Sequence, residues 1–210
     1  MKKIQVEQQT PQWDQLRKGK ITGTKLKKIL GTPKARKEFL YEAIAEKIAV
    51  GMNDLDISDM EWGNLYESEA RKKLEFDKNV KVETFGIGVS DENEDLVYSP
   101  DGWVESDKAG VEIKCPQWKN YLKYWLENVI EGKLIPDEYY EQILQAFIVN
   151  DEMEKMYFVI YNPLIKIHPI HIMEISRISL LSEIQRAKTE AVKFLEERDS
   201  IIKKYKLITM

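Results

Sequence analysis

The chain has 210 residues, of which 43% are apolar and 32% charged, and its formal net charge is -4. This fits one globular domain over 1–210 with a core around a sheet, and without a membrane-length apolar run or a signal peptide we expect a cytoplasmic protein. The single cysteine, Cys115, excludes an internal disulfide and any multi-cysteine metal site within one chain.

The N-terminal part, about 10–77, is expected to be helical. Apolar residues at helical spacing predict helices over 24–30, 39–48 and 61–76. From Leu16 to Lys37 the chain has nine basic residues and no acidic one, although the whole chain is acidic. Such a segregated patch suits contact with a nucleic-acid backbone, and a solvated helix face is an equally good interpretation.

In the core, about 78–175, the spacing of apolar residues changes from helical to strand-like. Short β-branched or aromatic stretches at 80–89, 94–99, 102–106 and 110–115 are separated by turn residues and predict a meander of strands. We expect helices over 116–132 and 136–150, strands over 155–162 and 166–175, and a C-terminal helix over about 179–204. This order predicts an α/β (α+β) fold, with a central mixed sheet flanked by helices.

Two carboxylates and a lysine interrupt the strand-like sequence between 99 and 116. In a strand, Glu112 and Lys114 point to one face and Ile113 to the other. If the strand beside Asp101 pairs with 110–115, Asp101 and Glu112 come close enough to share a divalent cation. Carboxylate oxygens and the Ile113 carbonyl would suit Mg²⁺ or Mn²⁺, and Lys114 would orient a water for attack on phosphorus. Metal-dependent hydrolysis of a phosphodiester is implied.

An exposed pair of Glu112 and Lys114 on a wet sheet face is the plainer interpretation of this short pattern by itself. Glu67 favours the catalytic interpretation, because helical spacing puts it beside small and apolar positions, so it need not face solvent. His168 and His171 are expected to be structural, since positions three apart in a strand face opposite sides.

Several motifs, in chain order, resemble the phage lambda exonuclease family, the alkaline viral recombination nucleases of the PD-(D/E)XK superfamily, with the YqaJ-like viral recombinases. They are WDQLRKGKITGTKLKKIL at 13–30, WGNLYESEAR at 62–71, SPDG at 99–102, GVEIKCP at 110–116 and YYEQILQAFIV at 139–149. The resemblance implies a restriction-endonuclease-like core. It also implies a Mg²⁺-dependent 5′ to 3′ exonuclease that digests linear double-stranded DNA and leaves 3′ single-stranded overhangs for phage-type recombination.

The resemblance also assigns individual roles. The metal ligands would be Asp101 and Glu112, with Glu67 as the helix carboxylate near a second ion, Lys114 as the catalytic lysine and Gln142 as the glutamine of the following helix. Arg17 and Thr24 match positions that help to bind the 5′-phosphate of the digested end. The segment Thr-Gly-Thr at 22–24 departs from the Thr-Ala-Ser that the family often has. An arginine, a hydroxyl and the amides of a helix start are suited to an anion.

Further properties are implied by the same resemblance. They are a ring-shaped homotrimer around duplex DNA, two Mg²⁺ or Mn²⁺ ions per site, a single-strand annealing protein as a partner, and a phage or prophage protein in the bacterial cytoplasm. Two other functions stay open: an endonuclease of the same superfamily, and a non-catalytic module that binds DNA ends. Docking of an annealing protein on the C-terminal helix is compatible with the enzyme.

Overall fold

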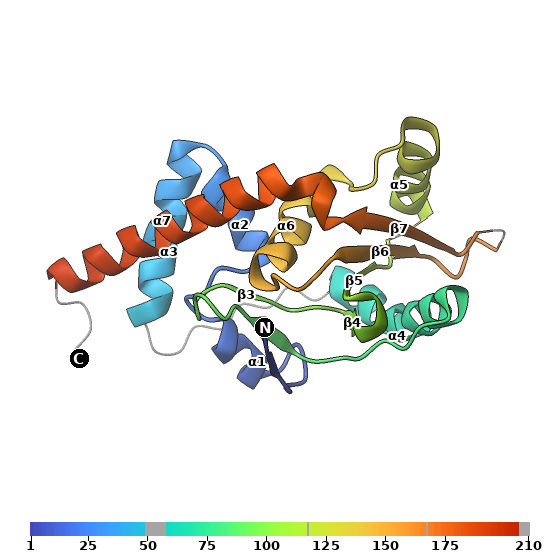
Figure 1. The fold of residues 1–210 in the computed structure, drawn as a ribbon, viewed down its shortest axis with the longest axis horizontal. Helices are drawn as coiled ribbons and strands as arrows, with labels where there is room; N and C mark the ends of the chain where they lie inside the picture. Colours follow the sequence, from blue (N-terminus) through green and yellow to red (C-terminus); the bar gives the residue numbers. More distant parts are fainter. Residues whose placement is uncertain (49–57, 117, 167, 206–210) are drawn as a thin grey trace.

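The structure is a computed structural model that describes residues 1–48, 58–116, 118–166 and 168–205. Its helices are α1 (Pro11–Arg17), α2 (Gly23–Leu30), α3 (Pro33–Ile48), α4 (Ser58–Lys78), α5 (Trp118–Glu131), α6 (Tyr140–Val149) and α7 (Leu181–Tyr205). Its strands are β1 (Lys2–Ile4), β2 (Ile87–Val89), β3 (Val97–Tyr98), β4 (Gly102–Val104), β5 (Ala109–Lys114), β6 (Lys155–Tyr161) and β7 (Ile170–Ser176). The predicted mixed sheet flanked by helices is confirmed (Figure 1).

The strands form two sheets rather than one continuous meander. The larger sheet has the order β4-β5-β6-β7, with β5 and β6 parallel and the other neighbours antiparallel. The smaller sheet is antiparallel, with the order β1-β2-β3. Pro100 lies between β3 and β4, and because it has no amide hydrogen it cannot continue a ladder of backbone hydrogen bonds. The sequence pattern predicted the strands from β2 onward but not this division.

The alternation of β5 puts apolar side chains on one face of the sheet and Glu112 and Lys114 on the other. Val111 and Ile113 lie in a core cluster with Ala70 and Leu74 of α4. Residues of β5 at even positions point the other way, toward α6, and Glu112 contacts that helix. Figure 1 shows α4 on one side of the sheet and α6 on the other.

The second core cluster joins α2, α3, α6 and α7. Phe39 of α3 stacks on Phe194 of α7, with ring centroids 5.1 Å apart. The Arg198 side chain of α7 is 1% exposed, pairs with Asp95 and donates a hydrogen bond to the Gly19 carbonyl at 3.1 Å. Helix α7 therefore fixes the loop that leads into α2.

The strand β1 was not predicted, and it brings the N-terminal segment beside residues 84–86. The Gly86 amide donates to the Ile4 carbonyl at 3.1 Å. A Cβ at position 86 would lie 2.1 Å from the Val6 carbonyl oxygen, so this close approach requires glycine. The segment 5–9 consequently runs along the edge of the site described below.

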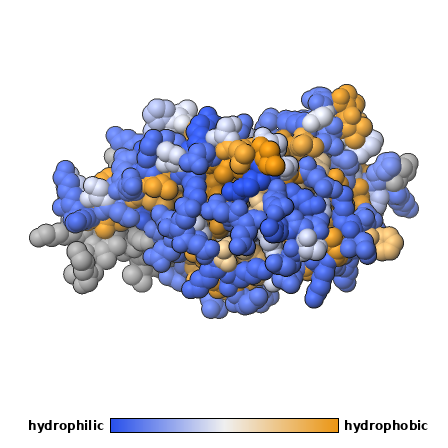
Figure 2. All heavy atoms as spheres, in the orientation of Figure 1, coloured by the Kyte–Doolittle hydropathy of each residue, from blue (hydrophilic) through white to orange (hydrophobic). Residues whose placement is uncertain are grey.

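The face shown in Figure 2 is mostly polar, and one of its groups of apolar atoms lies over α5. These include the exposed Leu126, Val129 and Ile130, whereas Tyr121 and Tyr124 of the same helix are buried in the core. Among the described helices, none has the length and apolar character needed to cross a membrane.

Candidate active site

The pairing of β4 with β5 brings Asp101 beside Glu112. Gly102 lies opposite Val111, and the Asp101 amide donates to the Val111 carbonyl at 3.2 Å. One carboxylate oxygen of Asp101, Oδ2, accepts a hydrogen bond from the Ile113 amide at 2.6 Å. The strand pairing on which the metal prediction depended is therefore present, with Asp101 directly before β4 rather than at the end of the preceding strand.

Glu112 is 4% exposed, and one of its oxygens, Oε1, contacts two donors. The Lys114 ammonium lies 2.5 Å from it, and the Gln142 side-chain amide of α6 donates to it at 2.5 Å. A strand and a helix that are distant in the sequence thus hold one carboxylate between them.

Glu67 reaches the site from α4, the helix on the opposite face of the sheet. Arg71, one turn later, donates through Nη2 to Glu67 and through Nε to the Asp101 carbonyl at 3.0 Å. Sequence reasoning missed Arg71, although the i,i+4 spacing from Glu67 was a usable signal.

Burial and mutual repulsion govern the protonation of these acids. Burial raises the pKa of Glu112 to about 7, and Asp101 and Glu67 act in the same direction against the charge of Lys114. Burial also raises the pKa of Asp101, although the charge of Lys114 acts in the opposite direction. Burial raises the pKa of Glu67 as well, and the charge of Asp101 raises it further. Burial disfavours the charged form of Lys114, but Glu112 and Asp101 outweigh this effect, so its pKa lies above the usual value.

This donor set fits a divalent cation. Burial is the largest cause of the raised pKa of Asp101 and Glu112, and Asp101 and Glu67 add to the shift at Glu112. A cation with hard oxygen ligands would favour the charged form of both acids. Within the described part of the chain, however, no three acidic, histidine or cysteine side chains converge as a ready metal-binding group. The predicted ligands Asp101, Glu112, Glu67 and the Ile113 carbonyl therefore remain predictions.

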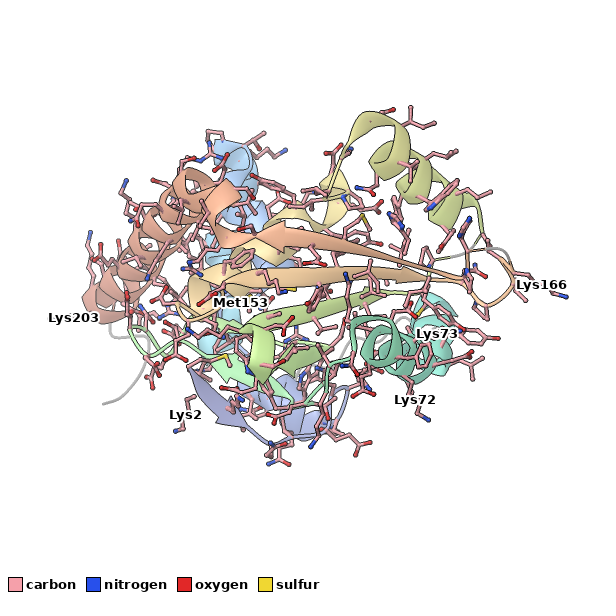
Figure 3. All side chains as sticks on the ribbon, turned by 45° about the vertical axis from the view of Figure 1, so that its right-hand side comes forward. Lys2, Lys72, Lys73, Met153, Lys166 and Lys203 are labelled. Carbon is pink, nitrogen blue, oxygen red and sulfur yellow. The ribbon has the colours of Figure 1, made fainter. Side chains whose placement is uncertain are left out.

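A groove with a volume of about 740 Å³ opens on two of the carboxylates, Glu67 and Asp101. Its other wall is the segment 5–9, where the Gln8 side chain donates to the Pro100 carbonyl at 2.7 Å. On the outer side of α4, Lys72 points away from the sheet (Figure 3). The groove gives access to the acidic residues from the side of the N-terminal segment.

Arg17, on α1, has an unusual environment for an arginine. Its guanidinium lies 3.8 Å from the centroid of the Trp13 ring, and its buried Nε has no hydrogen-bond partner. Burial lowers the pKa of Arg17, and Asp14 acts in the opposite direction. A buried donor without an acceptor suits a ligand that brings one.

The start of α2 adjoins the carboxylate site. The Thr24 hydroxyl lies 3.2 Å from that of Thr22, the residue that precedes the helix. A Cβ at Gly23 would lie 2.8 Å from Gln142 Cα, so the two helices touch at this point. The structure therefore brings Thr24 and the Glu112 cluster onto adjoining elements.

The histidines lie outside this cluster. His171 is hydrogen-bonded to the Asn128 side chain at 2.7 Å, and the His168 ring stacks on Trp125 at 5.6 Å. The exposed Asp91 pairs with the amino group of Met1. These contacts agree with the structural roles expected of both histidines.

A family model and several solved structures match most of this chain. The model of the YqaJ-like viral recombinase domain matches residues 12–152, a range that holds every predicted site residue. An alkaline exonuclease (LHK-Exo) from Laribacter hongkongensis is similar, with a TM-score of 0.78 and 25% identity over 94% of this chain and 96% of that chain.

Two further solved structures share the fold. LHK-Exo in complex with dAMP gives a TM-score of 0.75 at 22% identity, covering 93% of this chain and 98% of that chain. A phage related exonuclease from Haemophilus somnus 129PT gives 0.63 at 18% identity, covering 89% and 96%. No curated protein matches the chain.

Proposed function

Because the chain belongs to the family of the YqaJ-like viral recombinase domain, we propose that it is a metal-dependent exonuclease acting on linear double-stranded DNA. Digestion would run 5′ to 3′ and leave 3′ single-stranded overhangs for phage-type recombination. The similarity to the alkaline exonuclease LHK-Exo over nearly the whole of both chains supports the exonuclease class.

The observation that carries this proposal is the arrangement of Asp101, Glu112 and Lys114 on paired strands. Glu112 is buried and Asp101 is partly buried, both have raised pKa values, and an ammonium lies against Glu112. An exposed surface pair would show neither the burial nor the repulsion. These features favour catalysis over the plainer interpretation of the same residues.

In the proposed reaction, the acids would bind metal, while Lys114 and Gln142 would act through their observed contacts with Glu112. Asp101, Glu112 and Glu67 would hold Mg²⁺ or Mn²⁺, which supplies Lewis-acid stabilisation of the charge on the phosphate oxygens. Lys114 would orient the attacking water and stabilise charge that develops on the phosphate, since its ammonium is fixed by Glu112. Gln142 would position the Glu112 carboxylate.

The direction of digestion would follow from an anion pocket at α1 and α2. Arg17 offers a buried donor without a partner, and Thr24 offers a hydroxyl in the first turn of α2. A helix start attracts anions through its free amides and its dipole. We assign this pocket to the 5′-phosphate of the DNA end.

Assembly and partners are part of the proposal. The basic segment between Leu16 and Lys37 on an otherwise acidic chain suits a homotrimeric ring that encloses duplex DNA. The proposal also includes two metal ions per site and a single-strand annealing protein as partner. The protein would act in the bacterial cytoplasm as a phage or prophage protein.

The proposal is tested by comparing linear duplex DNA with covalently closed circles in the presence of Mg²⁺. We expect loss of the linear form, no cutting of the circle, and full inhibition by EDTA. Cutting of the closed circle would indicate an endonuclease instead. Binding of DNA ends without any cleavage would indicate a non-catalytic module.

A further inference from the structure

The Lys114 ammonium lies against an aromatic ring that sequence reasoning did not single out. Its Nζ is 5.0 Å from the ring centroid of Tyr139, the residue directly before α6. Lys114 belongs to β5, so the contact depends on how the helix packs on the sheet. Three positions further along, Gln142 donates a hydrogen bond to Glu112. One segment, 139–142, therefore contacts both Lys114 and Glu112.

The Tyr139 ring is held from two sides. It lies 5.4 Å from the Phe158 ring of β6 and 5.9 Å, edge to face, from the Tyr124 ring of α5. Phe158 and Tyr124 are themselves buried. The ring therefore presents a fixed surface to the ammonium.

An aromatic ring and a carboxylate restrain a lysine side chain in different ways. An ammonium has three N–H donors, and Glu112 accepts from Lys114 through one oxygen. The face of the ring attracts the positive charge through its quadrupole without accepting a proton, and this attraction is stronger where water is excluded. The ring can thus fix the position of Nζ while leaving a donor for the substrate.

We propose that Tyr139 is a positioning residue that holds the Lys114 ammonium in the orientation needed for cleavage. This inference rests on the proposed nuclease function. The proposed role differs from a role in core packing. Tyr139 also has a packing role, because it contacts the core cluster that joins α2, α3, α6 and α7. A packing role would affect the stability of the protein but not the turnover of the folded enzyme.

The first test compares variants of the full chain on linear duplex DNA with Mg²⁺. Tyr139→Leu keeps apolar volume and removes the ring, so kcat should fall by about 2- to 30-fold with little change in KM. Tyr139→Phe should recover most of that loss. Progressively fluorinated phenylalanines at position 139 should lower kcat in steps, because fluorine weakens the quadrupole while the shape is kept.

A matched control is available in the same sheet. Lys155 Nζ lies 4.7 Å from the centroid of the buried Tyr157 ring. Tyr157→Leu therefore removes a ring that also lies beside a lysine ammonium, at a more deeply buried position where no role in cleavage is proposed. Folded Tyr157→Leu protein should keep the wild-type kcat.

A second readout needs neither metal nor activity. In metal-free protein labelled with ¹³Cε-lysine, the ε-methylene signal that disappears in Lys114→Ala should show an upfield ring-current shift. The shift should be lost in Tyr139→Leu and kept in Tyr139→Phe. Loss of the shift in Tyr157→Leu would show that the effect is not specific to Tyr139.

The outcomes separate this inference from the function on which it rests. An active wild type with equal kcat in folded Tyr139→Leu, or a fluorinated series without a trend, would overturn the role of Tyr139 and leave the nuclease proposal intact. A wild type that cleaves no DNA would overturn the nuclease proposal and with it the catalytic part of this inference, while the NMR shift would still report the contact.

Discussion

Gly23 lies against Gln142 so closely that a Cβ at position 23 would be 2.8 Å from Gln142 Cα and 2.9 Å from its Cγ. Gln142 in turn donates to Glu112. The start of α2, where we place the 5′-phosphate, is therefore in direct contact with the residue that holds a proposed metal ligand. This relationship leads to the first prediction.

Gly23→Ala should displace Gln142 and reduce both stability and turnover. Overpacking of a tight contact costs about 1–3 kcal/mol of unfolding free energy, and displacement of Gln142 removes a hydrogen bond from Glu112. Urea denaturation and initial rates on linear duplex measure the two effects. Gly63→Ala in α4 is the control, because a Cβ there has no heavy atom within 4 Å. Wild-type behaviour of Gly23→Ala would show that the contact is not required.

The pKa of Glu112 predicts how the stability of the metal-free protein depends on pH. Its folded-state pKa of about 7 exceeds the ordinary value of 4.5, so the folded protein binds the proton more tightly than the unfolded chain. The resulting stabilisation is present below about pH 4.5 and is lost as the pH rises toward 7. We expect Tm to fall over this range in EDTA-treated wild type and to fall less in Glu112→Gln. Identical pH profiles would refute the raised pKa.

Arg17→Gln should remove the preference for a phosphorylated end. A charge-assisted hydrogen bond is worth roughly 1.5–3 kcal/mol, so digestion of 5′-phosphorylated duplex should slow by roughly 10- to 150-fold, toward the rate for 5′-hydroxyl ends. Lys72→Gln on the outer side of α4 removes a charge elsewhere and should leave the ratio of the two rates unchanged. An unchanged ratio in Arg17→Gln would remove Arg17 from the phosphate pocket.

Arg198→Met should destabilise the protein by about 3–5 kcal/mol, because Asp95 loses its buried cationic partner. Adding Asp95→Asn should recover part of this loss. Glu197→Gln, which breaks the more exposed pair with Arg36, should cost about 1 kcal/mol or less. Urea denaturation measures all three, and a small effect in Arg198→Met would contradict an anchoring role for α7.

The sequence predicted those parts of the fold and the site that depend on local pattern. Side-chain alternation placed Glu112 and Lys114 on one face of a strand, and the short connection after β4 favoured its pairing with β5. Helical spacing likewise located α4 and α7 close to their observed bounds. These features are governed by neighbours in the sequence.

Features that depend on distant contacts were not predictable. The three residues of β1 form a strand because they pair with β2, more than 80 positions away. The contact between Tyr139 and Lys114 requires the packing of a helix on a sheet, for which the chain carries no periodic signal. The roles of the site residues also stay predictions, because burial and repulsion support them without identifying the reaction.

The most direct test of the account is cleavage of 5′-phosphorylated linear duplex by wild type and by Lys114→Ala in Mg²⁺, with DNA binding measured in parallel. We predict that the wild type releases nucleotides from the 5′ end, and that Lys114→Ala binds DNA equally well but cleaves at least about 100-fold more slowly. Equal cleavage by the two proteins, or undiminished cleavage by wild type in EDTA, would contradict the account.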